Sequence, residues 1–356
     1  MFQITNKFLF ITIFLMSCSG GGGSSTGPDD GSDGSDTGGG DSYTFPNATN
    51  FDQENQIEVI SWNIQTFPQL STTPNYVKSL LETWNADLYL FQEIIDKNTL
   101  INMVNSMPEY SYVISGETSN MHFALVYKSA NSDCSACGIV NFNYSNELWS
   151  DTANYNDNDD DPTNNAKYQF ASRPPMENFV TWTNGTKSVN LYLIDIHYKC
   201  CGDNTLDISN KSSETTRRHY ASTLLRDYVI NQRASDYVMI AGDFNNIGEQ
   251  SISNPSISPL TDPDLNSNYF KMADEHVFYQ SNSTWSWQGW RSSYAPSHLD
   301  HVIISQPLFQ FESVSDSGIC QSGMGGTVLY EGVPIYNDAF GEIVYSGQNN
   351  TYIVLG

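Results

Sequence analysis

The sequence Tyr237-Val-Met-Ile-Ala-Gly-Asp-Phe-Asn-Asn246 carries the strongest structural signal in the chain. Its apolar run ends at Gly242, and Asp243 and Asn245 follow on alternating positions. The pattern predicts a buried strand whose carboxyl end delivers a carboxylate and an amide, and the two-residue period of a strand places both on one side. A glycine here allows backbone or a ligand to approach closely. The same residues also form turns after ordinary core strands, so this stretch alone does not distinguish a site from a turn.

Polar residues also mark the ends of other predicted strands. β-Branched and aromatic residues predict strands over Ile57–Ile64, Ala86–Glu93, His122–Lys128, Ser188–His197 and Ser297–Ser305. Three of them end at or near Asn63, Glu93 and His197, whereas the last carries its polar residues at its start. Apolar residues at helical spacing predict helices over residues 75–85, 98–106 and 214–232. Strands that alternate with helices indicate an α/β or α+β domain.

The charge of the chain restricts how it can hold a polyanion. Its 356 residues include 15 Lys and Arg against 40 Asp and Glu, which gives a formal net charge of -25. A protein that binds nucleic acid through its overall field is expected to be basic. Any action on phosphates therefore has to be local, and a bound cation that reverses the charge of the site would provide it.

The first 18 residues resemble a bacterial lipoprotein signal. Lys7 precedes a short apolar run over Phe8–Met16, which is too short to span a bilayer. The run ends in Leu15-Met16-Ser17-Cys18, which resembles a lipobox with a lipidated Cys18, and an ordinary secretory signal is the alternative. A Gly/Ser/Asp tether follows over residues 19–50, and a folded domain is expected over 51–356. We expect a monomer anchored by lipid to the cell envelope, at the outer membrane or the cell surface.

The remaining cysteines suit an exported protein, in which disulfides are plausible. Cys134 and Cys137 are spaced to close a small loop, and Cys200 or Cys201 could pair with Cys320. The spacing does not decide the connectivity. It also lacks the two pairs that a structural zinc site needs.

Two further segments carry chemistry of lower specificity. The acidic loop over Asp151–Asp161 is expected to be a solvated surface loop, and its Asp157–Asp161 part is a candidate structural Ca²⁺ site without the regular spacing of an EF-hand. Arg173 precedes a rigid Pro-Pro pair. Trp285, Trp287 and Trp290 are candidates for stacking on bases or entering lipid, and packing within a core is the equally favoured alternative.

Taken together, the strand-end residues resemble the endonuclease/exonuclease/phosphatase superfamily, the Mg²⁺-dependent phosphoesterases related to pancreatic-type deoxyribonuclease. The matching pieces occur in the family's order and cover nearly all of the chain after the tether. They are Ser61-Trp62-Asn63, Phe91-Gln92-Glu93, Ile196-His197, Gly242-Asp243-Phe244-Asn245 and Leu299-Asp300-His301-Val302. The resemblance implies a four-layer α/β/β/α sandwich of two mixed sheets with helices outside.

The resemblance also implies a role for each residue. Glu93 is expected as the principal ligand of Mg²⁺, with Asn63 beside it and Mn²⁺ as a second candidate ion. Catalytic roles are implied for Asp243, which orients or deprotonates the attacking water, for Asn245 and His197, which hold the phosphate, and for Asp300. The metal would act as a Lewis acid at the phosphoryl oxygen. Arg173 is implied as a further phosphate contact.

The chain departs from the family at its C-terminus. Family members normally end with a Ser-Asp-His segment, whereas this chain has no histidine after His301. Candidates for the missing pair are Asp338, His298 two residues before Asp300, and His301, whose side chain should point away from that of Asp300. General acid–base help contributes roughly 10²–10⁴-fold, so loss of the pair would leave a weak enzyme or none.

The sequence therefore supports an exported, metal-dependent phosphodiesterase, with a nuclease that cleaves DNA as the first expectation. Lipid head groups and sugar phosphates are alternative substrates of the same chemistry. A binding lipoprotein that keeps the fold without catalysis is the alternative from another functional class. The missing terminal pair favours this binding role, whereas the six retained polar residues oppose it: Asn63, Glu93, His197, Asp243, Asn245 and Asp300.

Overall fold

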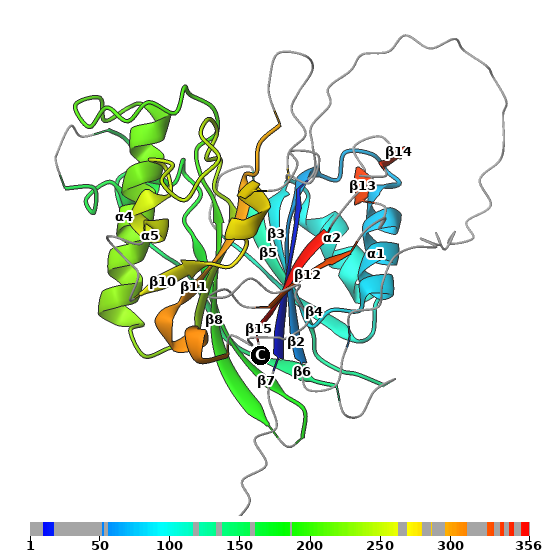
Figure 1. Ribbon diagram of the computed structural model, residues 1–356. Helices are drawn as coiled ribbons and strands as arrows, with labels where there is room; N and C mark the ends of the chain where they lie inside the picture. The colour runs from blue at the N-terminus through cyan, green and yellow to red at the C-terminus, as the bar shows by residue number, and fades with distance from the viewer. Residues whose placement is uncertain are drawn as a thin grey trace, which may run out of the picture.

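Two mixed β-sheets pack face to face, with helices on their outer sides, as Figure 1 shows. The computed structural model describes residues 10–17, 52, 56–116, 121–132, 137–156, 161–185, 187–262, 269–279, 286, 296–311, 326–330, 335–337, 342–344 and 350–355. The α+β sandwich expected from the resemblance is confirmed.

The first sheet has the strand order β12-β15-β1-β2-β3-β5-β4. Side chains are described for β2 (Gln56–Phe67), β3 (Leu88–Ile94), β4 (Tyr110–Ile114) and β5 (His122–Lys128). Backbone pairing adds β1 (Phe10–Ser17), β12 (Gly326–Tyr330) and β15 (Asn350–Leu355). Strands β1, β2 and β3 run parallel, and β5 pairs antiparallel with β3. The parallel pair brings the carboxyl ends of β2 and β3 to one edge.

The second sheet has the strand order β10-β11-β9-β8-β7-β6. Its strands are β6 (Ile139–Glu147), β7 (Met176–Thr183), β8 (Ser188–His197), β9 (Val238–Asp243), β10 (Phe270–Met272) and β11 (Asp300–Ser305). Strands β8 and β9 are parallel, and β11 is antiparallel to β9. The start of β11 therefore meets the ends of β8 and β9. A separate small pair is formed by β13 (Ile335–Asn337) and β14 (Glu342–Val344).

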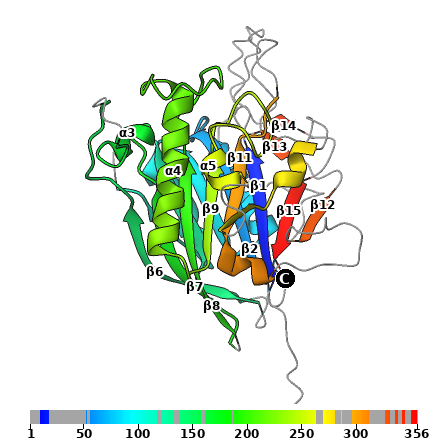
Figure 2. The same ribbon diagram turned by 60° about the vertical axis from the view of Figure 1, so that its left-hand side comes forward.

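Helices cover the outer face of each sheet. α1 (Thr73–Trp84) and α2 (Lys97–Asn105) share a core with β2 and β3, and α4 (Glu214–Gln232) shares one with β8 and β9 (Figure 2). α4 begins where the Ser213 hydroxyl accepts a hydrogen bond from the Thr216 amide. The short elements are α3 (Ala166–Gln169), α5 (Ser258–Thr261), η1 (Glu275–Tyr279) and η4 (Gln306–Phe311).

The space between the sheets changes from apolar to polar towards one end. Met239 and Ala241 of β9 and Val302 of β11 pack in the core between the sheets. Side chains alternate along a strand, so Asp243 and Asp300 continue the same inner face. On β8 that face reads Leu191, Leu193, Asp195 and His197, and on β3 it reads Leu88, Leu90 and Gln92. The polar residues thus gather at one end of the space between the sheets.

Most predicted elements are confirmed. The helix expected over residues 214–232 and the strands expected over 122–128 and 188–197 have the predicted bounds. The sequence analysis did not identify β4, β6 and β7. It was also wrong about Asn245, because β9 ends at Asp243 and the two-residue period of a strand does not extend to Asn245.

The segment predicted as an export signal takes part in a sheet. Its residues Phe10–Ser17 form β1, which pairs parallel with β2 and antiparallel with β15. Cleavage before Cys18 would remove this strand from the mature protein. The same residues therefore cannot serve both as a cleaved export signal and as strand β1 of one mature chain. Cys18 and the tether lie outside the described residues. No helix in the described part of the chain combines the length and apolar character needed to cross a membrane.

The structure describes three cysteines, of which one is disulfide-bonded and two are free thiols. Cys137 is disulfide-bonded, while Cys134 and Cys320 lie outside the described residues. Cys200 and Cys201 are exposed free thiols, so the pairing of either one with Cys320 is not found in the structure. Of the proposed calcium loop only Asp161 is described, and its Oδ1 accepts hydrogen bonds from Thr163.

Candidate active site

Three strands of the second sheet place polar side chains side by side. Across the sheet, His197 of β8 is the register partner of Asp243 of β9, which in turn is the partner of Asp300 of β11. Register partners in a sheet direct their side chains to the same face. Here that face is the inner one, and all three residues are buried. The row therefore points across the gap towards the other sheet.

Gly242 allows the two central strands of this row to approach each other. Its φ is +136°, and a Cβ at this position would lie 2.1 Å from the carbonyl oxygen of Ile196. The glycine therefore serves the close approach of backbone to backbone. Beyond Asp243 the chain turns, and Asn245 adopts a φ of 49°. Its amide N–H donates to Asp243 Oδ1 at 2.8 Å, and its Nδ2 donates to the carbonyl of Tyr198 at 3.2 Å.

The first sheet supplies Asn63 and Glu93 opposite this row. Asn63 Nδ2 lies 3.1 Å from both Glu93 Oε1 and Asp243 Oδ2, so one amide group bridges the carboxylates of the two sheets. Its Oδ1 accepts from the Gln65 N–H at 3.0 Å. Asn63 thus presents its nitrogen to the carboxylates, whereas a metal ligand would present its oxygen. Glu93 has a φ of 64° and is anchored by the Thr66 N–H to its Oε2 at 3.0 Å.

His197 lies between the two carboxylates. Its Nε2 is 3.7 Å from Glu93 Oε1 and 3.6 Å from Asp243 Oδ2. Its Nδ1 is buried and has no hydrogen-bond partner among the residues that the structure describes. Burial lowers the pKa of His197 well below its usual value, and the nearby Arg173 charge lowers it further. The imidazole is therefore neutral at physiological pH.

The carboxylates of the row are difficult to ionise. Burial raises the pKa of Asp243 to about 7, and the adjacent Glu93 charge adds to the rise. Burial also raises the pKa of Asp300 well above its usual value, again with a contribution from Asp243. Asp300 Oδ1 is buried without a hydrogen-bond partner in the described part of the chain. A positive charge placed among these groups would favour their ionised forms.

The donors present fit a divalent cation. One ligand atom each from Glu93, His197 and Asp243 lies within 4.8 Å of the others. The Glu93 side chain is 14% exposed, more than those of Asp243 and His197, so it is the most solvent-accessible of the three donors. Oxygen donors beside retained water suit Mg²⁺, and an imidazole extends the fit to Mn²⁺.

Arg173 does not reach into the site as a free cation. Its Nε donates to the carbonyl of His197 at 3.0 Å, and its guanidinium also donates to the carbonyl of Tyr198. In this arrangement the side chain holds the backbone that follows β8, and its expected role as a phosphate contact stays a prediction. It acts on the site through its charge, which lowers the pKa of Asp243 against the larger effect of burial.

The structure also identifies polar residues that the sequence analysis did not single out. Gln92 Nε2 donates to Asp195 Oδ1 at 2.6 Å across the two sheets, beneath the row His197–Asp243–Asp300. Burial raises the pKa of Asp195 well above its usual value. A buried aspartate within the apolar strand Leu193-Ile-Asp-Ile196 is the signal that could have found this contact.

The candidates for the missing terminal pair lie elsewhere. His298 is a candidate because it lies two residues before Asp300 and could face the site. Its Nε2 is instead hydrogen-bonded to Asp274 Oδ2 at 2.7 Å. His301 is bonded to the same carboxylate, on the outer face of its sheet. Asp338 and the tryptophans Trp285, Trp287 and Trp290 lie outside the described residues. The described site therefore contains one histidine, His197.

A model of the Endonuclease/Exonuclease/phosphatase family matches residues 60–319. The chain belongs to this family. Family members are phosphoesterases, and their enzymes use divalent metals. The matched range contains Asn63, Glu93, His197, Asp243 and Asp300. Family membership and the site geometry therefore concern the same part of the chain. No curated protein sequence matches the chain.

Solved structures share the fold of this family member at low sequence identity. D. rerio TDP2 humanized by 14 mutations has a TM-score of 0.51 and 13% identity, over 84% of this chain and 98% of that chain. D. rerio TDP2 complexed with a single strand DNA product has a TM-score of 0.50 and 12% identity, over 83% and 97%. A Bacteroides thetaiotaomicron mannosyl-6-phosphatase has a TM-score of 0.45 and 12% identity, over 83% and 97%. These similarities concern the fold alone.

Proposed function

We propose that the protein is a metal-dependent phosphodiester hydrolase and that its substrate is DNA. The observation that most directly supports metal-dependent hydrolysis is the row His197–Asp243–Asp300 facing Glu93 across two sheets. DNA is the substrate expected from the resemblance. Carboxylates held this close require a cation or a proton between them. Family membership supplies the reaction class, which is phosphoester hydrolysis.

In this proposal each residue has a separate task. The divalent cation, when bound, stabilises negative charge on the phosphoryl oxygens. Asp243 takes a proton from the attacking water, and its pKa of about 7 suits a base at neutral pH. Neutral His197 donates an N–H to a phosphate oxygen, and Asn63 holds the two carboxylates in place.

Asp300 is the proposed source of the proton for the leaving oxygen. Asp300 is not part of the three-residue group that fits the cation, and it lies beside Asp243 on the inner face. Burial raises the pKa of Asp300 well above its usual value, which favours the protonated form that a general acid needs. The proton that Asp243 removes from water and the proton that Asp300 gives to the alkoxide balance each other. This pair would take the place of the Ser-Asp-His segment expected from the resemblance.

A plasmid-nicking assay tests the proposal. Purified protein is incubated with supercoiled DNA in Mg²⁺, in Mn²⁺ and in chelator, beside Glu93→Gln and His197→Ala. Matched controls are Glu82→Gln, an exposed glutamate on α1, and His219→Ala, whose Nδ1 contacts the Pro255 carbonyl outside the site. We expect metal-dependent nicking that both site variants lose and both controls keep.

Two other outcomes would redirect the proposal. Activity on RNA, lipid phosphodiesters or sugar phosphates in place of DNA would keep the reaction class and change the substrate. Metal binding without cleavage of any of these would support a binding lipoprotein that has lost catalysis, the role favoured by the missing terminal histidine.

Export is a separate part of the proposal. We propose that the chain is cleaved before Cys18 and lipidated there, so that the tether holds the domain away from a membrane. Intact mass spectrometry of the protein from membrane fractions tests this. A mature chain that retains Phe10–Ser17 would instead support the strand β1 seen in the sheet.

A further inference from the structure

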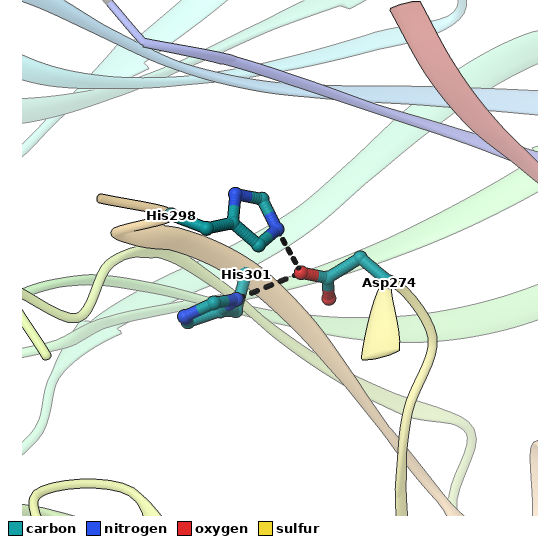
Figure 3. A group of neighbouring side chains, drawn as sticks. All are labelled: Asp274, His298 and His301. Atoms are coloured by element: carbon teal, nitrogen blue, oxygen red, sulfur yellow. Dashed lines mark hydrogen bonds and ion pairs between the residues drawn. The ribbon is translucent and has the colours of Figure 1, made fainter. Parts of the chain in front are cut away.

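A second cluster of ligand-type side chains lies behind the catalytic row. Asp274 follows β10, His298 precedes β11, and His301 belongs to β11 (Figure 3). His301 is the register partner of Gly242, whereas Asp300 is the partner of Asp243. Adjacent positions of a strand face opposite sides, so the cluster lies on the outer face of the same two strands. All three residues are almost completely buried.

Both imidazoles of this cluster converge on one oxygen atom. His298 Nε2 and His301 Nδ1 each lie 2.7 Å from Asp274 Oδ2, as Figure 3 shows. The other oxygen, Asp274 Oδ1, accepts from the Val302 N–H at 2.9 Å, which fixes the orientation of the carboxylate. Phe244 and Phe278 pack against the His301 ring. The three donors are therefore held in a rigid and largely apolar setting.

A contact outside the cluster holds the second ring nitrogen of His301. Its Nε2 lies 2.9 Å from the side-chain amide of Asn246, which orients the ring with Nδ1 towards Asp274. When Nε2 donates to the amide oxygen, the lone pair of Nδ1 points to the place between the imidazole and the carboxylate where a cation would bind. Histidines that bind metals commonly donate their other N–H to an oxygen in this way.

We propose that Asp274, His298 and His301 form a second metal site that binds a transition cation of the Zn²⁺ class. Two imidazole nitrogens and one carboxylate oxygen are ligands that Zn²⁺ prefers, whereas Mg²⁺ prefers oxygen alone. The three ligand atoms lie within 4.8 Å of one another. Ligands at about 2.0–2.2 Å around a tetrahedral ion are roughly 3.4 Å apart, so each 2.7 Å contact would open by about 0.7 Å.

The ion would stabilise the loop that follows the proposed catalytic aspartate. Asn246, which binds His301, also accepts hydrogen bonds from Gln250 and Asn254 on its carbonyl oxygen. Gln250 in turn accepts from the backbone N–H of His298 at 2.6 Å. The site thus connects the start of β11 to the turn after β9. This role is structural and does not depend on hydrolytic activity.

Metal binding to the full chain tests the proposal separately from catalysis. The Glu93→Gln variant, which weakens the proposed catalytic metal site, is stripped with chelator and titrated with Co²⁺. We expect one Co²⁺ per chain with the visible absorption of a low-coordinate nitrogen and oxygen site, displaced by one equivalent of Zn²⁺. Asp274→Asn in the same background should abolish this absorption, and Asn246→Ala should weaken affinity about 10–100-fold while keeping the stoichiometry.

Two controls keep the outcome decisive. Asp87→Asn changes another fully buried aspartate that belongs to a third carboxylate group, and it should leave the Co²⁺ absorption intact. Zn²⁺ should also raise the unfolding temperature of the Glu93→Gln variant. In this variant Asp274, His298 and His301 are all intact, so the measurement does not depend on a substitution within the cluster. No Co²⁺ absorption and no Zn²⁺-dependent rise would overturn the proposal and leave a purely hydrogen-bonded network. Equal binding by Asp274→Asn would overturn it as well.

Discussion

The two faces of β9 and β11 carry clusters of similar composition and opposite electrostatics. On the inner face, Asp243 and Asp300 share the site with Glu93 and one imidazole, and burial raises the pKa of Asp243 to about 7. On the outer face, a single carboxylate, Asp274, meets two imidazoles. Burial alone would raise the pKa of Asp274, but His301 and His298 hold it well below its usual range.

The ratio of carboxylates to imidazoles accounts for this difference. Both clusters are buried, so desolvation acts in the same direction on each aspartate. Excess carboxylate leaves unbalanced negative charge, which favours a proton or a hard cation and provides a base near neutral pH. Excess imidazole keeps the carboxylate ionised and favours a softer cation. In our proposals, one strand pair thus carries a reactive site on its inner face and a structural site on its outer face, distinguished by ligand type.

The largest expected effect comes from removing the base on the inner face. Asp243→Asn should reduce the rate of phosphodiester hydrolysis by about 10²–10⁴-fold, because the amide cannot accept a proton from water. The rate is measured under single-turnover conditions at saturating Mg²⁺. Asp274→Asn is the comparison on the outer face. An equal loss of rate in both variants at unchanged fold would contradict the division of roles.

The second expectation concerns stability on the outer face. Asp274→Asn should lower the free energy of unfolding by about 3–5 kcal/mol, because it removes the partner of buried imidazoles. Urea unfolding in chelator measures the change, with Asp227→Asn as an exposed aspartate control paired to Arg226. A loss below about 1 kcal/mol would mean that the imidazoles do not depend on the Asp274 charge.

The third expectation concerns Gly242, which lies between the two clusters. Gly242→Ala should cost about 1–3 kcal/mol from its φ alone, and the clash with the Ile196 carbonyl at 2.1 Å should force β8 and β9 apart. Displacing His197 from Asp243 would then reduce activity. Gly185→Ala is the matched control, because its φ is +78° but a Cβ there meets nothing within 4 Å. Similar behaviour of the two variants would show that close packing at Gly242 is unimportant.

The smallest expected effect is a pH dependence of stability. The folded protein holds the Asp243 proton up to about pH 7, whereas the unfolded chain releases it near 3.8. The folded state therefore binds more protons in this window, and the contribution of Asp243 to stability falls as pH rises through it. In chelator, Asp243→Asn should match the wild-type unfolding temperature at about pH 4 and exceed it at about pH 8. A difference that does not grow with pH would contradict the raised pKa.

Much of the fold was predictable because its strands and helices carry strong local patterns. The apolar run before His197 and the helical spacing over residues 214–232 predict elements whose bounds the structure confirms. Strands β6 and β7 were missed. In β6, exposed positions and the register shift between Phe142 and Tyr144 weaken the two-residue period that a sequence displays.

The site was predictable in composition and less so in orientation. Asn63, Glu93, His197, Asp243 and Asp300 were named from their motifs, and the structure brings them together. The direction of the Asn63 amide, the carbonyl contacts of Arg173 and the turn at Asn245 were not predictable. Each depends on a partner far along the chain or on a backbone angle that the sequence does not display.

The sequence by itself determined which residues end the strands and which reaction class they suit, because strand periodicity and motif order are local properties. The same periodicity predicted that the adjacent residues Asp300 and His301 point to opposite faces of their strand. Only the tertiary structure decided which partners each one meets, Asp243 on the inner face and Asp274 on the outer face. Asp274 reaches the second cluster through the pairing of β10 with β11, a contact that no local pattern records.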